Sequence, residues 1–125
     1  MNQPHRQKVG QWGEAVAAQY LEARGYQVVQ RNVRTPFGEI DLVASQAQSL
    51  VFVEVKARTN LRYGQPEDAV TARKLAHMID SAQFYMGQHS QQAGQGWQID
   101  VIAIIGRPGD EPDHVDIQHF QNVAS

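Results

Sequence analysis

The stretch FGEIDLVASQAQSLVFVEVKAR, residues 37–58, decides the fold because it holds two runs of strand-forming residues joined by a polar segment. EIDLVA and LVFVEVKA are rich in β-branched and apolar residues, and SQAQS between them is typical of a turn. The pattern predicts an antiparallel hairpin. Its strands also carry Asp41, Glu54 and Lys56. A charge inside an apolar run is costly unless it is solvated, paired or bound to a ligand.

The residues around this hairpin predict further helices and strands. Gly25 follows the first helical pattern at a position typical of a left-handed helix cap, and the nearly continuous apolar run IDVIAII predicts a strand buried on both faces. The expected elements are a helix from about Gln7 to Arg24, a strand from Tyr26 to Val33, the two hairpin strands, a second helix ending near Met86, a strand over 99–105 and a last strand from His114 to Phe120.

The connections between these elements set the strand directions. Short turns join the first three strands, which should therefore be antiparallel, whereas the crossover through the second helix implies a parallel pair. That helix begins either at Pro66, which suits a first turn, or after Thr71 as its cap. The expected fold class is α/β, a mixed β-sheet flanked by helices with an αβββαβ core and an extra C-terminal strand, in a single domain of residues 1–125.

The composition limits the function classes. The chain is 42% hydrophobic and 19% charged, which is ordinary for a globular protein. No window approaches the ~18 apolar residues of a membrane helix, and no apolar segment follows the basic N-terminus as in a secretory signal. The absence of cysteine fits a cytoplasmic location and leaves only oxygen or imidazole ligands for a metal. The net charge of -2 argues mildly against a nucleic-acid binder.

The spacing of the three hairpin charges suggests a site. Glu54 and Lys56 share one face of their strand, and a turn centred between residues 47 and 48 places Asp41 opposite Glu54. Opposed carboxylates repel each other at a Cβ separation of ~4.5–5.5 Å, and a Mg²⁺ ion between them would turn that repulsion into a metal site. A solvated face with a cross-strand salt bridge is the more common outcome, so the spacing leaves both interpretations open.

The first helix offers a further carboxylate, Glu14. It shares one side of the helix with Gly10, Ala17, Ala18 and Leu21, while a second apolar strip contains Val9, Trp12, Val16 and Tyr20. Either strip can face the core, so the sequence alone does not decide whether Glu14 points inward.

Basic residues follow the ExK segment. Arg58, Arg62 and Tyr63 lie after Lys56, and Lys74 lies on the second helix. They can clamp a phosphate backbone or remain solvated. Asp100 lies at the head of the buried run IDVIAII and is expected to cap or turn that strand, with a role in a site as the less common alternative.

Several segments together resemble a known family. GxxGE in VGQWGEAVAAQYL, then GEIDLVA, VFVEVKAR, GQPEDAVTARK and IDVIAI are similar to the YraN-like family of small bacterial proteins, from Val9 to Ile105. That family resembles the PD-(D/E)xK nucleases and, among them, the archaeal Holliday junction resolvases. Ile40 stands where the nuclease motif has proline.

The resemblance implies a restriction-endonuclease-like fold and cleavage of branched or otherwise unusual DNA in repair or recombination. It implies that Glu14, Asp41 and Glu54 bind Mg²⁺, or Mn²⁺ in its place, with the backbone carbonyl of Val55. Lys56 would act on the attacking water or the phosphate. DNA is the implied partner, and a homodimer would suit a four-way junction. The alternative is a non-catalytic DNA- or protein-binding module on the same fold.

Overall fold

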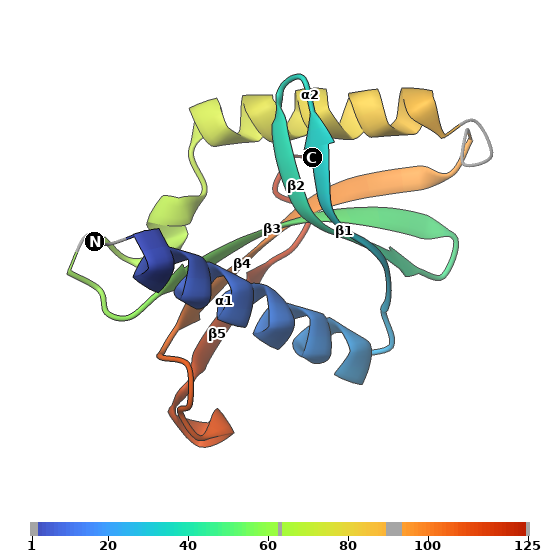
Figure 1. The fold of residues 1–125 in the computed structure, drawn as a ribbon. Helices are drawn as coiled ribbons and strands as arrows, with labels where there is room; N and C mark the ends of the chain where they lie inside the picture. The colour runs from blue at the N-terminus through green and yellow to red at the C-terminus, as the bar shows by residue number, and fades with distance from the viewer. Residues whose placement is uncertain (1–2, 63, 90–93, 125) are drawn as a thin grey trace.

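A five-stranded sheet lies between two helices in the structure, a computed structural model that describes residues 3–62, 64–89 and 94–124 (Figure 1). The elements are α1 (Gln3–Ala23), β1 (Gln27–Thr35), β2 (Gly38–Gln46), β3 (Ser49–Arg58), the 3₁₀ turn η1 (Pro66–Ala69), α2 (Ala72–Gln88), β4 (Gly96–Ile105), the 3₁₀ turn η3 (Pro112–His114) and β5 (Asp116–Phe120). Within those described ranges, no helix has both the length and the apolar character needed to cross a membrane.

The strands follow the chain order β1-β2-β3-β4-β5 across the sheet. β1 with β2, β2 with β3 and β4 with β5 are antiparallel. β3 and β4 are parallel because α2 carries the chain back across the sheet between them. The predicted α/β class, with an αβββαβ core and an extra C-terminal strand, is confirmed.

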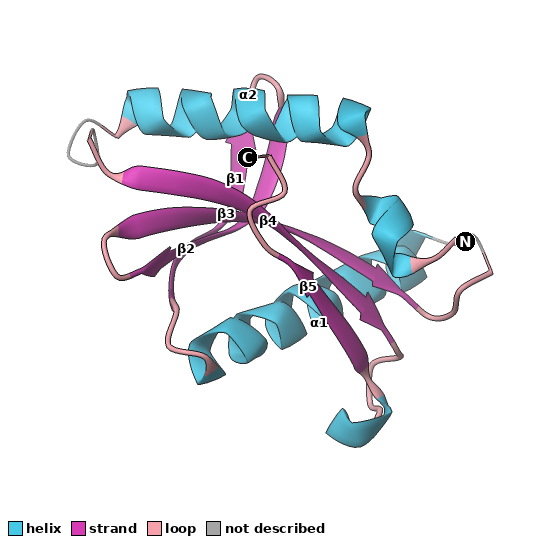
Figure 2. Cartoon of the chain, turned by 180° about the vertical axis from the view of Figure 1, so that it is seen from behind, coloured by secondary structure: helices cyan, strands magenta, loops and turns pink. Residues whose placement is uncertain are grey.

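Each helix covers one face of the sheet (Figure 2). Beneath α1 the core contains Ala17, Ala18 and Leu21 of the helix against strand residues such as Val53. The helical strip that contains Glu14 therefore faces the sheet. Gly13 allows this close approach, because a Cβ at Gly13 would lie 2.5 Å from the Cβ of Ala57.

The second helix begins later than the first of the two expected positions. Pro66 starts only the turn η1, and Thr71 caps α2, where its hydroxyl accepts the Lys74 N–H at 3.2 Å. Beneath α2 a second core joins Ala82 and Tyr85 to strand residues that include Phe52. At the end of α1, Gly25 has a φ of 90°, which confirms the predicted left-handed cap.

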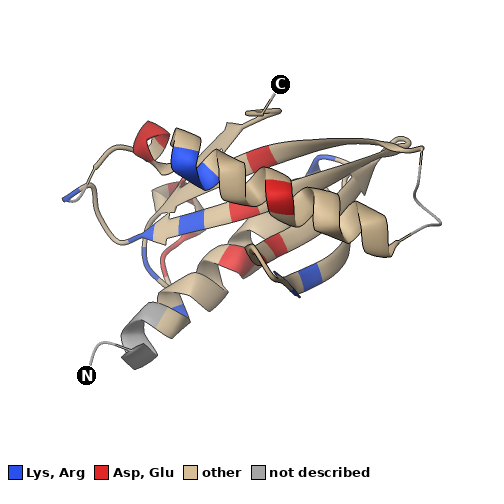
Figure 3. Ribbon diagram, turned by 90° about the horizontal axis from the view of Figure 1, so that it is seen from above, with Lys and Arg blue, Asp and Glu red and all other residues tan. Residues whose placement is uncertain are grey.

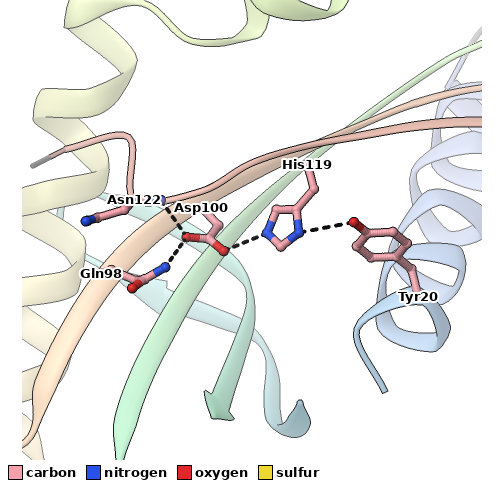
Figure 4. Close-up of polar contacts among 5 residues, drawn as sticks. All are labelled: Tyr20, Gln98, Asp100, His119 and Asn122. Atoms are coloured by element: carbon pink, nitrogen blue, oxygen red, sulfur yellow. Dashed lines mark hydrogen bonds and ion pairs between the residues drawn. The ribbon is translucent and has the colours of Figure 1, made fainter. Parts of the chain in front are cut away.

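Asp100 does not cap its strand, contrary to the expectation from sequence. β4 begins at Gly96, so Asp100 lies inside the strand with 0% of its surface exposed. Its oxygens accept hydrogen bonds from the Gln98 side chain and the Asn122 N–H, both at 2.9 Å, and its Oδ2 lies 2.6 Å from Nε2 of His119 (Figure 4). The hydroxyl of Tyr20 on α1 lies 3.3 Å from the other ring nitrogen of His119. This network ties β4, β5 and α1 together.

Candidate functional site

The hairpin of β2 and β3 has the predicted register over most of its length, but the predicted pair of Asp41 and Glu54 does not form: Asp41 lies with Glu14 of α1, whereas Glu54 lies toward α2. Pairing runs from Gln46 opposite Ser49 to Leu42 opposite Val53. At the next position along β2, the Asp41 carboxylate accepts the backbone N–H of Val55 at 2.8 Å. In a regular antiparallel ladder, a backbone carbonyl of β2 would accept the Val55 N–H. Here the Asp41 side chain accepts it instead. The two strands separate here, and the separation makes room for a site.

The side-chain alternation of β2 changes at the same point. Ile40 and Val43 both belong to the core beneath α2, although residues three apart in a regular strand face opposite ways. In β1, the register places Asn32 across from Asp41, and Asn32 has a φ of 52°. Asparagine tolerates this left-handed conformation better than most residues. The irregular backbone re-aims Asp41 relative to a regular strand.

Three carboxylates meet at this position. One oxygen from each of Glu14, Glu39 and Asp41 lies within 4.8 Å of the other two. Figure 3 shows acidic positions on α1 and on neighbouring strands lying side by side. Glu14 and Asp41 were candidate ligands from sequence, whereas Glu39 was missed. The available signal was the two-residue spacing of GEID, which puts Glu39 and Asp41 on one face of a regular strand.

Burial and crowding strongly affect the ionisation of this group. Burial raises the pKa of Asp41 to about 7 from an ordinary value of 3.8, although the Val55 N–H acts in the opposite direction. Negative charges on Glu14, Glu54 and Glu39 contribute to this rise in the pKa of Asp41. The carboxyl group is therefore poised to keep its proton near neutral pH unless a cation compensates its charge.

Glu14 responds to the same surroundings. Burial raises the pKa of Glu14, and the charge of Glu39 adds to the effect, while Asn32 and Arg31 lower it. Glu14 directly follows Gly13, where α1 lies close against Ala57 of β3. The helix thus holds a half-buried carboxylate against the opening between the strands.

Glu54 and Lys56 lie toward the other helix. Both line a hollow of about 200 Å³ together with Phe37, Gly38, Glu39, Lys74, His77, Met78 and Ser81. The structure thus brings Glu54 and Lys56 to one side, as their spacing predicts. Glu54 is outside the group of three close carboxylates, and its charge still acts on Asp41. Glu39 borders both the acidic group and the hollow.

The donor set suits a hard divalent cation. Mg²⁺ takes oxygen ligands at ~2.0–2.1 Å, so two of its ligands lie at most ~4.2 Å apart. The oxygens of Glu14, Glu39 and Asp41 reach that spacing with small side-chain movements from their present separation of up to 4.8 Å. The carbonyl of Val55 would be a fourth oxygen on this side, because the N–H and C=O of one strand residue point to the same neighbour, and the Val55 N–H points to Asp41.

The candidate phosphate-binding residues lie in different places. Lys74 lines the hollow beside Lys56. Arg58 is half-buried, and its Nη1 has no hydrogen-bond partner in the part of the chain that the structure describes. Arg62 is exposed in the loop that follows β3, and Tyr63 lies outside the described residues. Only Lys74 of the four is thus seen to border the hollow.

The sequence is similar to a set of bacterial proteins of one family. The profile of the family described as "Uncharacterised protein family UPF0102" matches residues 13–104. A UPF0102 protein of Syntrophotalea carbinolica is 41% identical over 115 residues, which cover 92% of this chain and 89% of the relative. One of Syntrophomonas wolfei is 46% identical over 102 residues, covering 82% and 88%. One of Paenarthrobacter aurescens is 41% identical over 116 residues, covering 93% of each chain. The chain therefore belongs to family UPF0102, the YraN-like family that its motifs resemble.

Proposed function

We propose that this protein is a Mg²⁺-dependent endonuclease that hydrolyses phosphodiesters in branched or otherwise unusual DNA during repair or recombination in the cytoplasm. The observation that carries the proposal is the group of three carboxylates, Glu14, Glu39 and Asp41, beside the strand that bears Lys56. The resemblance to PD-(D/E)xK nucleases supports DNA as the substrate.

The metal-binding role falls to the crowded acids. Glu14, Glu39 and Asp41, with the Val55 carbonyl, would hold the cation, and Mn²⁺ can replace Mg²⁺ in an oxygen site of this kind. Glu54, a ligand by its motif, lies outside this group and would reach the cation only from the side of the hollow. A divalent cation bound there polarises the phosphate and lowers the pKa of a water molecule. The raised pKa of Asp41 supports this assignment, because a cation would keep that carboxylate ionised.

Lys56 acts from the side of the hollow. Lys56 lies next to Glu54 there, with Lys74 on the opposing helix. The Lys56 ammonium group would orient the attacking water or stabilise the charge that develops on the phosphate oxygens. Lys74 would hold a neighbouring phosphate, with Arg58, Arg62 and Tyr63 as further backbone contacts.

A non-catalytic DNA- or protein-binding module is the second candidate. The net charge of -2 favours weak or assisted DNA binding, because a protein that binds DNA by itself usually neutralises several phosphates. In that case the nuclease-like site would bind DNA or protein without cutting. A homodimer would present two such sites to a four-way junction.

The test is cleavage of linear, flapped and four-way-junction DNA in Mg²⁺ and in Mn²⁺. We expect the wild-type protein to cut a branched substrate and EDTA to abolish cutting. Asp41→Asn, Glu54→Ala and Lys56→Ala should each reduce the rate by more than about 100-fold, the scale of losing a group that stabilises the transition state. Glu22→Ala, an exposed acid on α1, is the matched control. Cutting that survives the Glu54 and Lys56 substitutions would reject this site, and binding without cutting would favour the non-catalytic module.

A further inference from the structure

An exposed aromatic ring lies at the edge of the candidate active site. Phe37, in the tight turn between β1 and β2, is 49% exposed. Val29 and Leu61 are the other large apolar side chains exposed to a similar degree within the described residues. Single exposed apolar residues are common and need no explanation. Phe37 differs because it lines the same hollow as Glu54, Lys56 and Lys74.

The turn that carries Phe37 is held in place. The Thr35 hydroxyl accepts the Phe37 N–H at 3.1 Å and donates to the Gly38 carbonyl at 2.7 Å. The same hydroxyl lies 3.0 Å from the Ser81 hydroxyl on α2, which fixes the turn to the helix. The Phe37 ring meets Phe84 edge to face, with ring centroids 6.4 Å apart. The exposed Phe37 ring is thus carried by a turn that hydrogen bonds and α2 hold in place.

The residues around the Phe37 ring include groups that can contact the base and the phosphate of a nucleotide. The hollow is lined by Phe37 together with Lys56, Lys74 and His77, and the acids Glu39 and Glu54 also border it. Aromatic rings stack on bases and cationic side chains contact the phosphate backbone wherever proteins hold single-stranded nucleic acid. Its volume of about 200 Å³ is below the ~300–1,000 Å³ of pockets that enclose drug-sized ligands. A hollow of this size can take part of a single nucleotide.

We propose that Phe37 is a stacking platform for one unpaired base next to the bond that is cut. In an intact duplex both faces of each base are covered by its neighbours, so the ring can reach a base only where the stack is interrupted. The substrate is then DNA with unpaired nucleotides, such as a flap, a gap or an opened junction. This inference rests on the proposed function and specifies its substrate.

The competing role for Phe37 is to pin the hairpin to α2 through Phe84. A pin would need only an apolar side chain of similar size, whereas a stacking platform needs the flat face of an aromatic ring. The two roles therefore predict different outcomes for leucine and for tryptophan at this position.

The experiment measures binding in EDTA, which prevents cutting. A fluorescein-labelled single-stranded oligodeoxynucleotide and its blunt duplex are titrated with the wild-type protein and with Phe37→Ala, Phe37→Leu and Phe37→Trp. We expect Phe37→Ala and Phe37→Leu to weaken single-strand binding by about 5- to 100-fold, the loss typical of one stacking aromatic. Duplex affinity should change less than twofold, and Phe37→Trp should retain binding with quenched indole fluorescence.

Leu61→Ala is the matched control, since Leu61 is 43% exposed and is not among the residues that line the hollow. It should leave both affinities unchanged, and thermal melting should confirm that each variant is folded. Equal losses for the single strand and the duplex, full binding by Phe37→Leu, or a wild-type protein that binds neither oligonucleotide would overturn the proposal. Selective single-strand binding that depends on Phe37, in a protein that cuts nothing, would leave this inference standing and reject the nuclease function.

Discussion

Asp41 and Asp100 are carboxylates on the strands that flank β3, the first half-buried and the second fully buried, and their surroundings differ completely. Asp100 is fully buried and accepts two hydrogen bonds at 2.9 Å, with Nε2 of His119 a further 2.6 Å away. Asp41 accepts the Val55 N–H and lies among other acids. Burial alone therefore does not identify a functional carboxylate. A buried acid among donors is a structural anchor, whereas a buried acid among acids favours a cation.

The largest effect that we predict comes from removing the anchor. Asp100→Ala leaves His119, Gln98 and the Asn122 N–H without their acceptor. Breaking a buried pair in this way usually costs about 3–5 kcal/mol, so we expect a loss of that size in the free energy of unfolding, measured with urea. The exposed Asp116→Ala on β5 is the control and should be close to neutral. A loss below about 1 kcal/mol would mean that the network contributes little, as for an ordinary hydrogen bond.

Removing the Asp41 carboxylate should raise the stability of the protein instead of lowering it. In EDTA the folded protein keeps the proton of Asp41 up to about pH 7, whereas an unfolded chain releases it near 3.8. The stability of the wild type should therefore fall as the pH rises through this window. Asp41→Asn should not show that loss. At pH 8 its free energy of unfolding should exceed that of the wild type by up to about 4 kcal/mol, at ~1.4 kcal/mol per pKa unit.

Urea unfolding at pH 4 and pH 8 checks this reversal. At pH 4 the two proteins should differ little, and at pH 8 the variant should be the more stable. Excess Mg²⁺ should stabilise only the wild type, because a ligand raises the stability of the state that binds it. A variant that is less stable than the wild type at pH 8 in EDTA would remove the charge-crowding argument for Asp41.

The smallest predicted effect concerns the helix that both regions share, since α1 carries Glu14 and Tyr20. Gly13→Ala places a Cβ 2.5 Å from that of Ala57, and overpacking of this kind costs about 1–3 kcal/mol. The helix must shift, which also moves Glu14 away from Asp41. Gly10→Ala has open space around it and should instead gain about 0.5–1 kcal/mol. Thermal melts with and without Mg²⁺ distinguish Gly13→Ala from Gly10→Ala. Equal melting temperatures of the two variants would contradict the close contact between Gly13 and Ala57.

Local patterns were enough to predict most of the fold. The polar turn between two apolar runs gave the β2–β3 register, and the helical crossover gave the parallel pair β3–β4. Gly25 marked the end of α1 because few other residues take its conformation at little cost. The two open choices, the buried side of α1 and the start of α2, depended on contacts with the sheet and with η1.

The candidate site was predictable only in part. Glu14 and Asp41 follow from spacing and the family motif, and the structure brings them together. Regular alternation put Asp41 directly beside Glu54, and it could not anticipate the strand irregularity opposite Asn32, after which Asp41 lies with Glu14 instead of with Glu54. The link from Asp100 to His119 spans 19 residues and has no local signal.

The sequence by itself determined the order of the elements, the direction of the strands and the family, because these depend on periodicity, turn chemistry and motifs within short segments. Only the tertiary structure decided the surroundings of each buried carboxylate. Those surroundings come from chain segments far apart, which packing of α1 and α2 on the sheet brings together. The ionisation of Asp41 and the anchoring of Asp100 both depend on such neighbours.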